Sequence, residues 1–135
     1  MISIYGSDGK IDIEILGYQN ASSSCKEDCN WLDCKISVVF SDVVITARCA
    51  IQTYDIIELY EKLKVGNRTF KWTLPENDAS LEFVINERTV SHIKFVWRQK
   101  IGEEMISAST VIQVGRASKE ICCAIQQLVE EFPGI

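Results

Sequence analysis

The chain has 135 residues, the length of one ordinary domain, and 47% of them are hydrophobic while 24% are charged. With only two prolines and seven glycines, this composition excludes a mainly disordered or collagen-like chain. The 14 basic and 19 acidic residues give a net charge of −5, which repels phosphate chains and disfavours direct binding of nucleic acid. We expect a single domain over residues 1–135.

Targeting and membrane signals are missing from the sequence. The N-terminal segment alternates isoleucines with Asp12 and Glu14, unlike a signal peptide. No stretch approaches the roughly 18 uninterrupted apolar residues of a membrane-spanning helix, and neither end carries a lipidation pattern. We therefore expect a cytoplasmic protein that does not bind a membrane.

The first half of the chain alternates apolar and polar residues with the period of a β-strand. Ile11, Ile13 and Ile15 alternate with charged residues, which indicates one buried and one solvent-exposed strand face. Ser7-Asp8-Gly9 is a predicted turn between the first two strands. In chain order, the pattern predicts strands over residues 2–5, 10–15, 31–40 and 43–52.

The second half continues the same pattern, with turn-forming residues between the segments. The predicted strands cover residues 70–74, 81–85, 93–97 and 106–114, and the predicted turns are Pro75-Glu76-Asn77-Asp78 and Asn86-Glu87-Arg88. The last strand mixes serines with β-branched residues, so the pattern leaves its buried face open. Together, these strands and turns predict a meander of antiparallel strands.

Two segments change to the three-to-four spacing of an amphipathic helix. Thr53 is the predicted N-cap of a short helix over residues 54–64, with Gly66-Asn67 as its stop. The closing helix has an apolar stripe that includes Ile121 and Ile125. The predicted fold class is α+β: a mainly antiparallel β meander, as a curled sheet or a sandwich, with one short internal helix and a C-terminal amphipathic helix.

Six cysteines raise the question of a metal or disulfide site. Cys25 and Cys29 are three residues apart, and neither a histidine nor a second pair completes a zinc motif. We expect no metal and no cofactor. Cys34, Cys49 and Cys122 fall on apolar faces, where a thiol packs as a small hydrophobe. Cys25 and Cys29 lie among polar residues, so we expect two free thiols in an exposed loop.

Catalytic motifs are also missing, and we expect a protein that is not an enzyme. The single histidine, His92, falls on the outward side of its strand beside Lys94. No serine has the context of a nucleophile elbow, and the glycines do not form a phosphate loop. Glu103 and Glu104 would point to opposite faces of a strand, so they could not share a substrate.

The three tryptophans are candidates for core packing or for binding. Trp72 and Trp97 are in register with buried positions, which favours the core. Trp31 begins a strand on the face opposite Leu32 and follows an acidic loop. It is either a protein-binding hot spot or a residue packed under the last helix.

Three segments carry a family resemblance: the opening Ile2-Ser-Ile-Tyr-Gly-Ser-Asp-Gly-Lys-Ile-Asp-Ile-Glu-Ile-Leu-Gly-Tyr18, then Asn30-Trp-Leu-Asp-Cys-Lys-Ile36, then Thr53-Tyr-Asp55 leading a helix. They resemble the immunity proteins of the wall-associated-protein type (WapI-like), over most of the chain. The resemblance implies a small cytosolic bacterial protein that binds and neutralises the C-terminal domain of a contact-delivered polymorphic toxin, often an RNase. Where similar sequences usually have a plain polar loop, this chain has Cys25 and Cys29.

The net charge agrees with that role, because an acidic inhibitor is steered onto the basic groove of a toxin that attacks RNA. Solubility alone also explains such a charge. We predict an immunity protein that forms a stoichiometric complex with a cognate toxin domain, with Glu27, Asp28, Trp31 and Asp33 as candidate contact residues. The alternative is a small-ligand carrier whose curled sheet encloses an apolar cavity.

Overall fold

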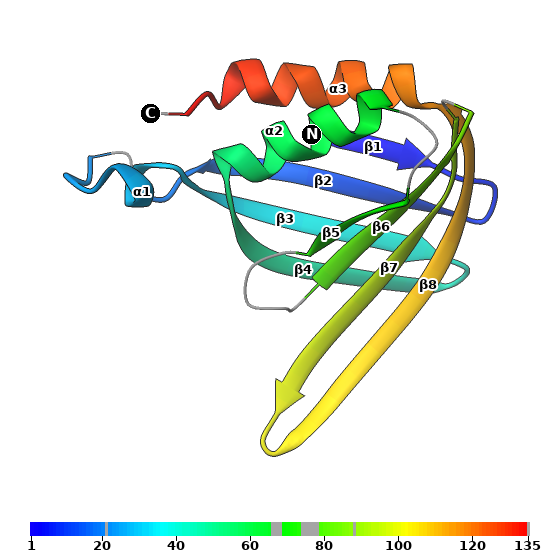
Figure 1. Ribbon diagram of the computed structural model, residues 1–135. Helices are drawn as coiled ribbons and strands as arrows, with labels where there is room; N and C mark the ends of the chain where they lie inside the picture. The colour runs from blue at the N-terminus through cyan, green and yellow to red at the C-terminus, as the bar shows by residue number, and fades with distance from the viewer. Residues whose placement is uncertain (21, 66–68, 74–78, 88, 135) are drawn as a thin grey trace.

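Eight strands form two four-stranded antiparallel sheets, and two long helices pack against them (Figure 1). A computed structural model describes residues 1–20, 22–65, 69–73, 79–87 and 89–134. The predicted α+β class, mainly antiparallel β, is confirmed. The elements are β1 (Ile2–Tyr5), β2 (Gly9–Tyr18), α1 (Lys26–Cys29), β3 (Trp31–Phe40), β4 (Val43–Gln52), α2 (Thr53–Val65), β5 (Thr69–Thr73), β6 (Ala79–Asn86), β7 (Thr89–Ile101), β8 (Glu104–Ala117) and α3 (Ser118–Glu131).

Each sheet is a meander in which strands that follow one another in the chain are neighbours. The first sheet, sheet A, has the order β1-β2-β3-β4, and the second, sheet B, has the order β5-β6-β7-β8. Helix α2 follows β4 directly and leads toward β5. The strands therefore form two sheets rather than one curled sheet, and each sheet has its own two edge strands.

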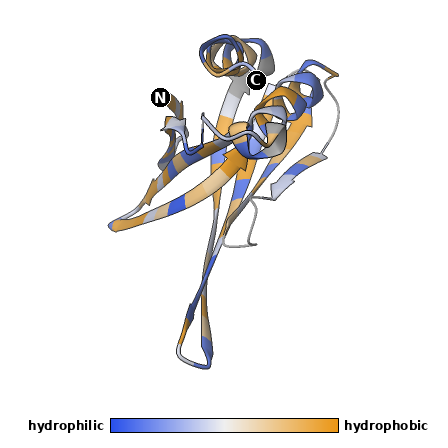
Figure 2. Ribbon diagram, turned by 90° about the vertical axis from the view of Figure 1, so that its left-hand side faces the viewer, coloured by the Kyte–Doolittle hydropathy of each residue, from blue (hydrophilic) through white to orange (hydrophobic). Residues whose placement is uncertain are grey.

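The inner faces of both sheets contribute to one apolar core. Ile36 on β3 and Phe83 and Phe95 on sheet B have no exposed surface, because apolar residues alternate with polar ones along each strand. Figure 2 shows the hydrophobic residues concentrated where the strands and helices meet. Among the described side chains of β8 the buried one is that of Ile112, which identifies the inner face of the strand that mixes serines with β-branched residues.

Helices α2 and α3 contact each other and close one side of the core. They lie above β1 and β2 in the view of Figure 1. Their apolar stripes bury the residues that the three-to-four spacing singles out, namely Ile56, Leu59 and Leu63 on α2 and Ile121, Ile125 and Leu128 on α3.

The start of α2 differs from the prediction. Thr53 is itself the first residue of α2, is only 3% exposed and donates a hydrogen bond to Asn30 Oδ1 at 3.2 Å, so Gln52 and not Thr53 occupies the capping position. Asp55 Oδ2 instead accepts the backbone N–H of Gln52 at 2.7 Å, as the acidic residue of a capping box does. The sequence suggests Thr53 as the cap because a hydroxyl before an apolar run can either cap the helix or form a hydrogen bond to another segment.

The turn between β1 and β2 connects the two sheets. Ser7 N–H donates to the carbonyl of Gln113 on β8 at 2.9 Å, and Gln113 N–H donates to Asp8 Oδ1 at 3.1 Å. A Cβ atom on Gly6 would collide with Ile112 and with the carbonyl oxygen of Gln113. Only glycine therefore allows this close approach of the turn to the edge of β8.

Strands β7 and β8 extend well beyond the predicted ends and project from the rest of the fold (Figures 1 and 2). The first residue of β6, Ala79, pairs with Trp97, and among the residues that the structure describes those of β7 after Trp97 pair with β8 alone. Gly102, with φ 63°, allows the two-residue turn that joins them. The apolar pattern stops near Trp97 while the backbone ladder continues, which is why the sequence predicts shorter strands.

Some predictions lie outside the described residues: the helix stop at Gly66-Asn67, the turn over residues 75–78, and Arg88 in the turn after β6. Within the described ranges, no helix is long and apolar enough to cross a membrane.

Phe95 provides a direct test of the shared core. We expect Phe95→Ala to lower the free energy of unfolding by about 3–5 kcal/mol, because it leaves a cavity where two sheets meet. Denaturant titration followed by tryptophan fluorescence measures the loss. Val44→Ala is the control, since Val44 is 65% exposed, and an equal loss in both variants would contradict the assigned core.

Candidate partner-binding surfaces

The connection between β2 and β3 contains α1 and extends past the ends of both strands (Figure 1). Asp28 on α1 is exposed. Of the predicted contact residue Glu27 only the backbone is described, as part of α1. The sequence did not predict this helix, because four residues are too few to show a helical period.

Trp31 and Asp33 lie close together on the outer face of sheet A, opposite the core. Trp31 is half-buried and Asp33 is exposed, whereas Leu32 between them is fully buried. Gln19 contacts both: its backbone N–H donates to the Trp31 carbonyl at 2.9 Å, and its Nε2 donates to Asp33 Oδ1 at 2.7 Å. Two of the four predicted contact residues therefore share one face, away from the apolar stripe of α3.

The outer face of sheet A carries equal numbers of positive and negative side chains. Lys10 and Asp12 form an ion pair at 3.0 Å, which raises the pKa of Lys10, first through their hydrogen bond and then through charge attraction. Beside Asp33 lies a shallow depression of about 240 Å³, lined by Gln19, Asp33, Cys34, Arg48, Cys49 and Ala50. A partner on this face would therefore meet both signs of charge.

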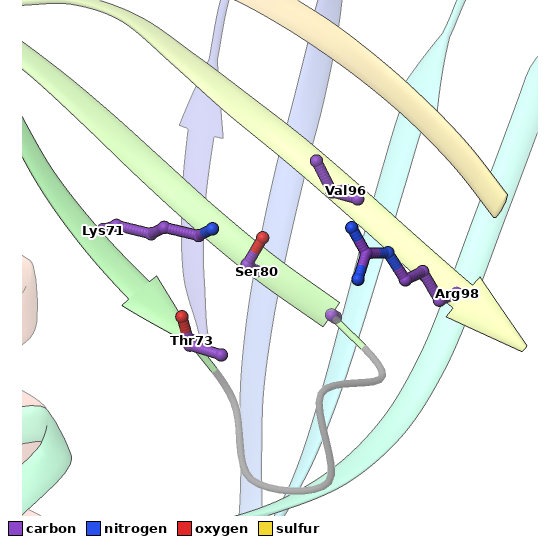
Figure 3. Close-up of a pocket in the computed structure, with 6 residues that line it drawn as sticks. Lys71, Thr73, Ser80, Val96 and Arg98 are labelled. Atoms are coloured by element: carbon purple, nitrogen blue, oxygen red, sulfur yellow. The ribbon is translucent and has the colours of Figure 1, made fainter.

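The outer face of sheet B is basic, although the whole chain is acidic. Its described residues include four cationic side chains and one carboxylate, Glu82. Figure 3 shows Lys71 extending from β5 toward Ser80, and Arg98 folded back along β7 beside Val96. Glu82 pairs with Lys94 at 3.4 Å. The four cationic residues are Lys71, Lys94, Arg98 and Lys100.

This basic face was not predicted from the sequence, although a signal for it exists. Lys94, Arg98 and Lys100 occupy positions of the same parity along one strand, so the strand period alone places them on one side. The net charge of −5 concealed them, because a sum over the chain carries no spatial information. Acidic residues outnumber basic ones on α2 and α3, where six carboxylates accompany three lysines.

The thiols near α1 differ from the prediction of an exposed pair. Cys25 is exposed, but Cys29 is only 5% exposed. The single turn of α1 directs Cys29 inward, and its Sγ donates to the carbonyl of Ser23 at 2.9 Å. In the described ranges no three potential ligands among His, Cys, Asp and Glu lie close enough together to hold a metal ion.

Cys34 and Cys49 are direct cross-strand partners on β3 and β4, and the Cys49 thiol lies 3.8 Å from the carbonyl oxygen of Cys34. The pKa of Cys34 is raised far above its usual value, first by its hydrogen bond to the Cys49 side chain and then by burial. Burial also raises the pKa of Cys122. These thiols are therefore neutral and poorly nucleophilic at neutral pH.

The alternative carrier function requires an apolar cavity inside a curled sheet. A partly apolar groove with a volume of about 360 Å³ lies between α2 and α3, not between strands. Its lining includes Tyr60, Leu63 and Cys122, but also Lys64 and Lys119. The groove is open to solvent, unlike the enclosed sites that retain small ligands.

Thiol accessibility tests the placement of these cysteines. We expect iodoacetamide at pH 8 to modify Cys25 and Cys123 rapidly, because both are exposed. Cys29, Cys34 and Cys122 should react slowly, because burial removes access and a raised pKa keeps the last two protonated. Peptide mass spectrometry at successive times measures the rates. Rapid modification of Cys34 in folded protein would contradict the structure, and unfolded protein provides the positive control.

Comparison with known proteins agrees with the resemblance found in the sequence. The model of the Immunity protein WapI-like family matches residues 2–130. No curated protein and no solved structure matches the chain. Membership implies toxin neutralisation by a protein that is typically non-enzymatic, with a cognate toxin as partner. Because the match covers nearly all of the 135 residues, the chain belongs to the WapI-like immunity protein family.

Proposed function

We propose that this chain neutralises an RNase-type toxin in the cytoplasm by forming a one-to-one complex with its C-terminal domain. The observation that carries the proposal is the family match over residues 2–130. A complex that blocks the toxin needs an exposed recognition surface and no reactive group of its own.

The charge distribution supports an RNase as the target. A domain that cuts RNA presents a basic groove to the phosphate backbone. The helical layer of α2 and α3 is rich in carboxylates, and Asp28 and Asp33 add exposed negative charge near the start of β3. An acidic surface of this kind raises the association rate with a basic groove.

The proposed contact surface is centred on Trp31 and includes Glu27, Asp28 and Asp33. Tryptophan is enriched among the residues that dominate binding energy, because a large ring buries much apolar area at low entropic cost. Trp31 is only half-buried in the free chain, and the N–H of Gln19 fixes its backbone through a hydrogen bond to its carbonyl. Its side chain therefore has exposed surface that a partner can bury.

The test uses the C-terminal domain of the toxin encoded beside this chain. We expect wild-type chain to co-purify with that domain and to restore growth when both are expressed. Trp31→Ala should weaken the affinity by about 30-fold, equivalent to about 2 kcal/mol. Isothermal titration calorimetry with a catalytically inactive toxin domain measures the affinity.

Val44→Ala is the matched control, because Val44 also lies on the outer face of sheet A and is 65% exposed. We expect its affinity to equal that of the wild type. Thermal melting of both variants separates binding from stability. A large drop in melting temperature for Trp31→Ala with unchanged affinity would show that Trp31 is a structural residue, and failure of wild-type chain to bind would overturn the proposed function.

A further inference from the structure

The edge of β8 leaves backbone groups free over a long stretch. In an antiparallel pair, successive residues point their N–H and C=O groups alternately toward the partner strand and away from it. Gln113 uses both groups to bind the β1–β2 turn, so it points away from β7. The register of β7 and β8 is continuous from Gln113 to Glu104. The residues that face the free edge are therefore Met105, Ser107, Ser109 and Val111.

Nothing within the described residues covers these four positions. Backbone hydrogen bonds from other elements reach β8 only at Gln113. The segment from Met105 to Gly115 contains no charged residue and no proline, the features that usually protect an edge strand from pairing with another chain. Met105 and Val111 are 62% and 41% exposed. The edge is long, uncharged and open.

The binding of the β1–β2 turn shows that this edge accepts another segment. Asp8 supplies a carboxylate oxygen and Ser7 a backbone N–H, and together they satisfy both groups of Gln113. A strand added alongside β8 would continue from this contact toward Met105. It would use the same alternation of donors and acceptors.

The charge beside the edge selects the kind of strand that fits. Lys100 and Arg98 are the cross-strand neighbours of Met105 and Ser107 on the outer face of sheet B. Both are exposed, and in the described part of the chain neither lies within ion-pair distance of a carboxylate. The small side chains of Ser107 and Ser109 leave the long basic side chains room to reach across β8. An incoming strand with acidic residues on its outward side complements this face.

We infer that the free edge of β8, from Met105 to Val111, binds an extended acidic segment of the toxin by adding it to sheet B as a further strand. The inference rests on the proposed function, because the partner is the toxin. It assigns a second contact surface, separate from the one around Trp31. Main-chain hydrogen bonds supply the affinity, and the basic outer face selects the acidic strand.

Amide hydrogen exchange tests the pairing residue by residue, with the inactive toxin domain as probe. In the free chain, the amides of Ser107, Ser109 and Val111 should exchange rapidly, while those of Ile106 and Thr110 are protected by β7. In the complex, the first group should slow by at least ~10-fold. A complex that forms with unchanged exchange at all three edge amides would overturn the inference and leave the proposed function intact.

Ser109→Pro tests the same edge by removing one N–H and placing a ring where the new strand would lie. The substitution removes no hydrogen bond to β7, since Ser109 faces outward, and edge strands tolerate proline there. We expect affinity for the toxin domain to fall by about 30-fold, because one hydrogen bond is lost and the ring keeps the added strand at a distance. Ser109→Val is the matched control, because it keeps the N–H, and its affinity should remain at the wild-type value. Equal affinity of both variants would overturn the inference.

Charge reversal tests the acidic character of the added strand. Lys100→Glu should reduce the association rate about tenfold at low salt, whereas Lys119→Glu on α3 should not.

Sedimentation of the free chain tests whether a second copy of the chain occupies the edge instead of the toxin. A dimer of wild-type chain that Ser109→Pro dissociates would show that a second copy occupies the edge and would overturn the inference. If wild-type chain does not bind the toxin domain at all, the proposed function fails and this inference fails with it.

Discussion

Both sheets depend on one shared apolar core, to which Ile36 of sheet A and Phe95 of sheet B contribute side chains without exposed surface. Neither sheet could persist alone, because four strands with one apolar face need a second layer to cover it. Helices α2 and α3 close the same core from one side. The alternation of apolar and polar residues therefore determines which face of every strand is inner, and hence which side chains are available to a partner.

The two-sheet arrangement leaves open edges that a closed barrel would not have. The β1–β2 turn covers one short part of the β8 edge through Ser7 and Asp8. Beyond that contact, the β7–β8 hairpin continues outside the core, where the two strands pair with each other and with no other strand of the described ranges. Such a hairpin contributes little to stability. Its length is better explained by recognition than by folding, which is consistent with an immunity protein.

Charge is segregated in the structure, and this changes the interpretation of the net charge of −5. Carboxylates predominate on α2 and α3, whereas the outer face of sheet B carries Lys71, Lys94, Arg98 and Lys100. A partner that approaches the helices and one that approaches sheet B experience opposite fields. The toxin can therefore be oriented, and not only attracted, by its own charge distribution.

Strand positions could be predicted because alternation is local, as residues 31–40 show by matching β3 in full. The predicted turns also gave the correct meander of neighbouring strands, but local patterns did not predict its division into two sheets. The depth of Cys29 depends on a four-residue helix without a detectable period, and the burial of Thr53 depends on its hydrogen bond to Asn30, 23 positions away in the sequence. The basic face was not predicted, because the net charge of the chain does not show which charged residues lie on the same side of a strand. The roles of Glu27, Asp28, Trp31 and Asp33 stay predictions, since no local rule identifies a binding surface.

The central claim is that this chain neutralises a toxin by stoichiometric binding. Titrating the purified chain into a fixed concentration of the neighbouring toxin domain, with RNA cleavage as the readout, tests it most directly. The account predicts that cleavage falls in proportion to added chain and stops at one equivalent, with a one-to-one mass by light scattering. Unchanged cleavage, or complete inhibition by a small fraction of an equivalent, would contradict it, because the latter requires a catalytic mechanism.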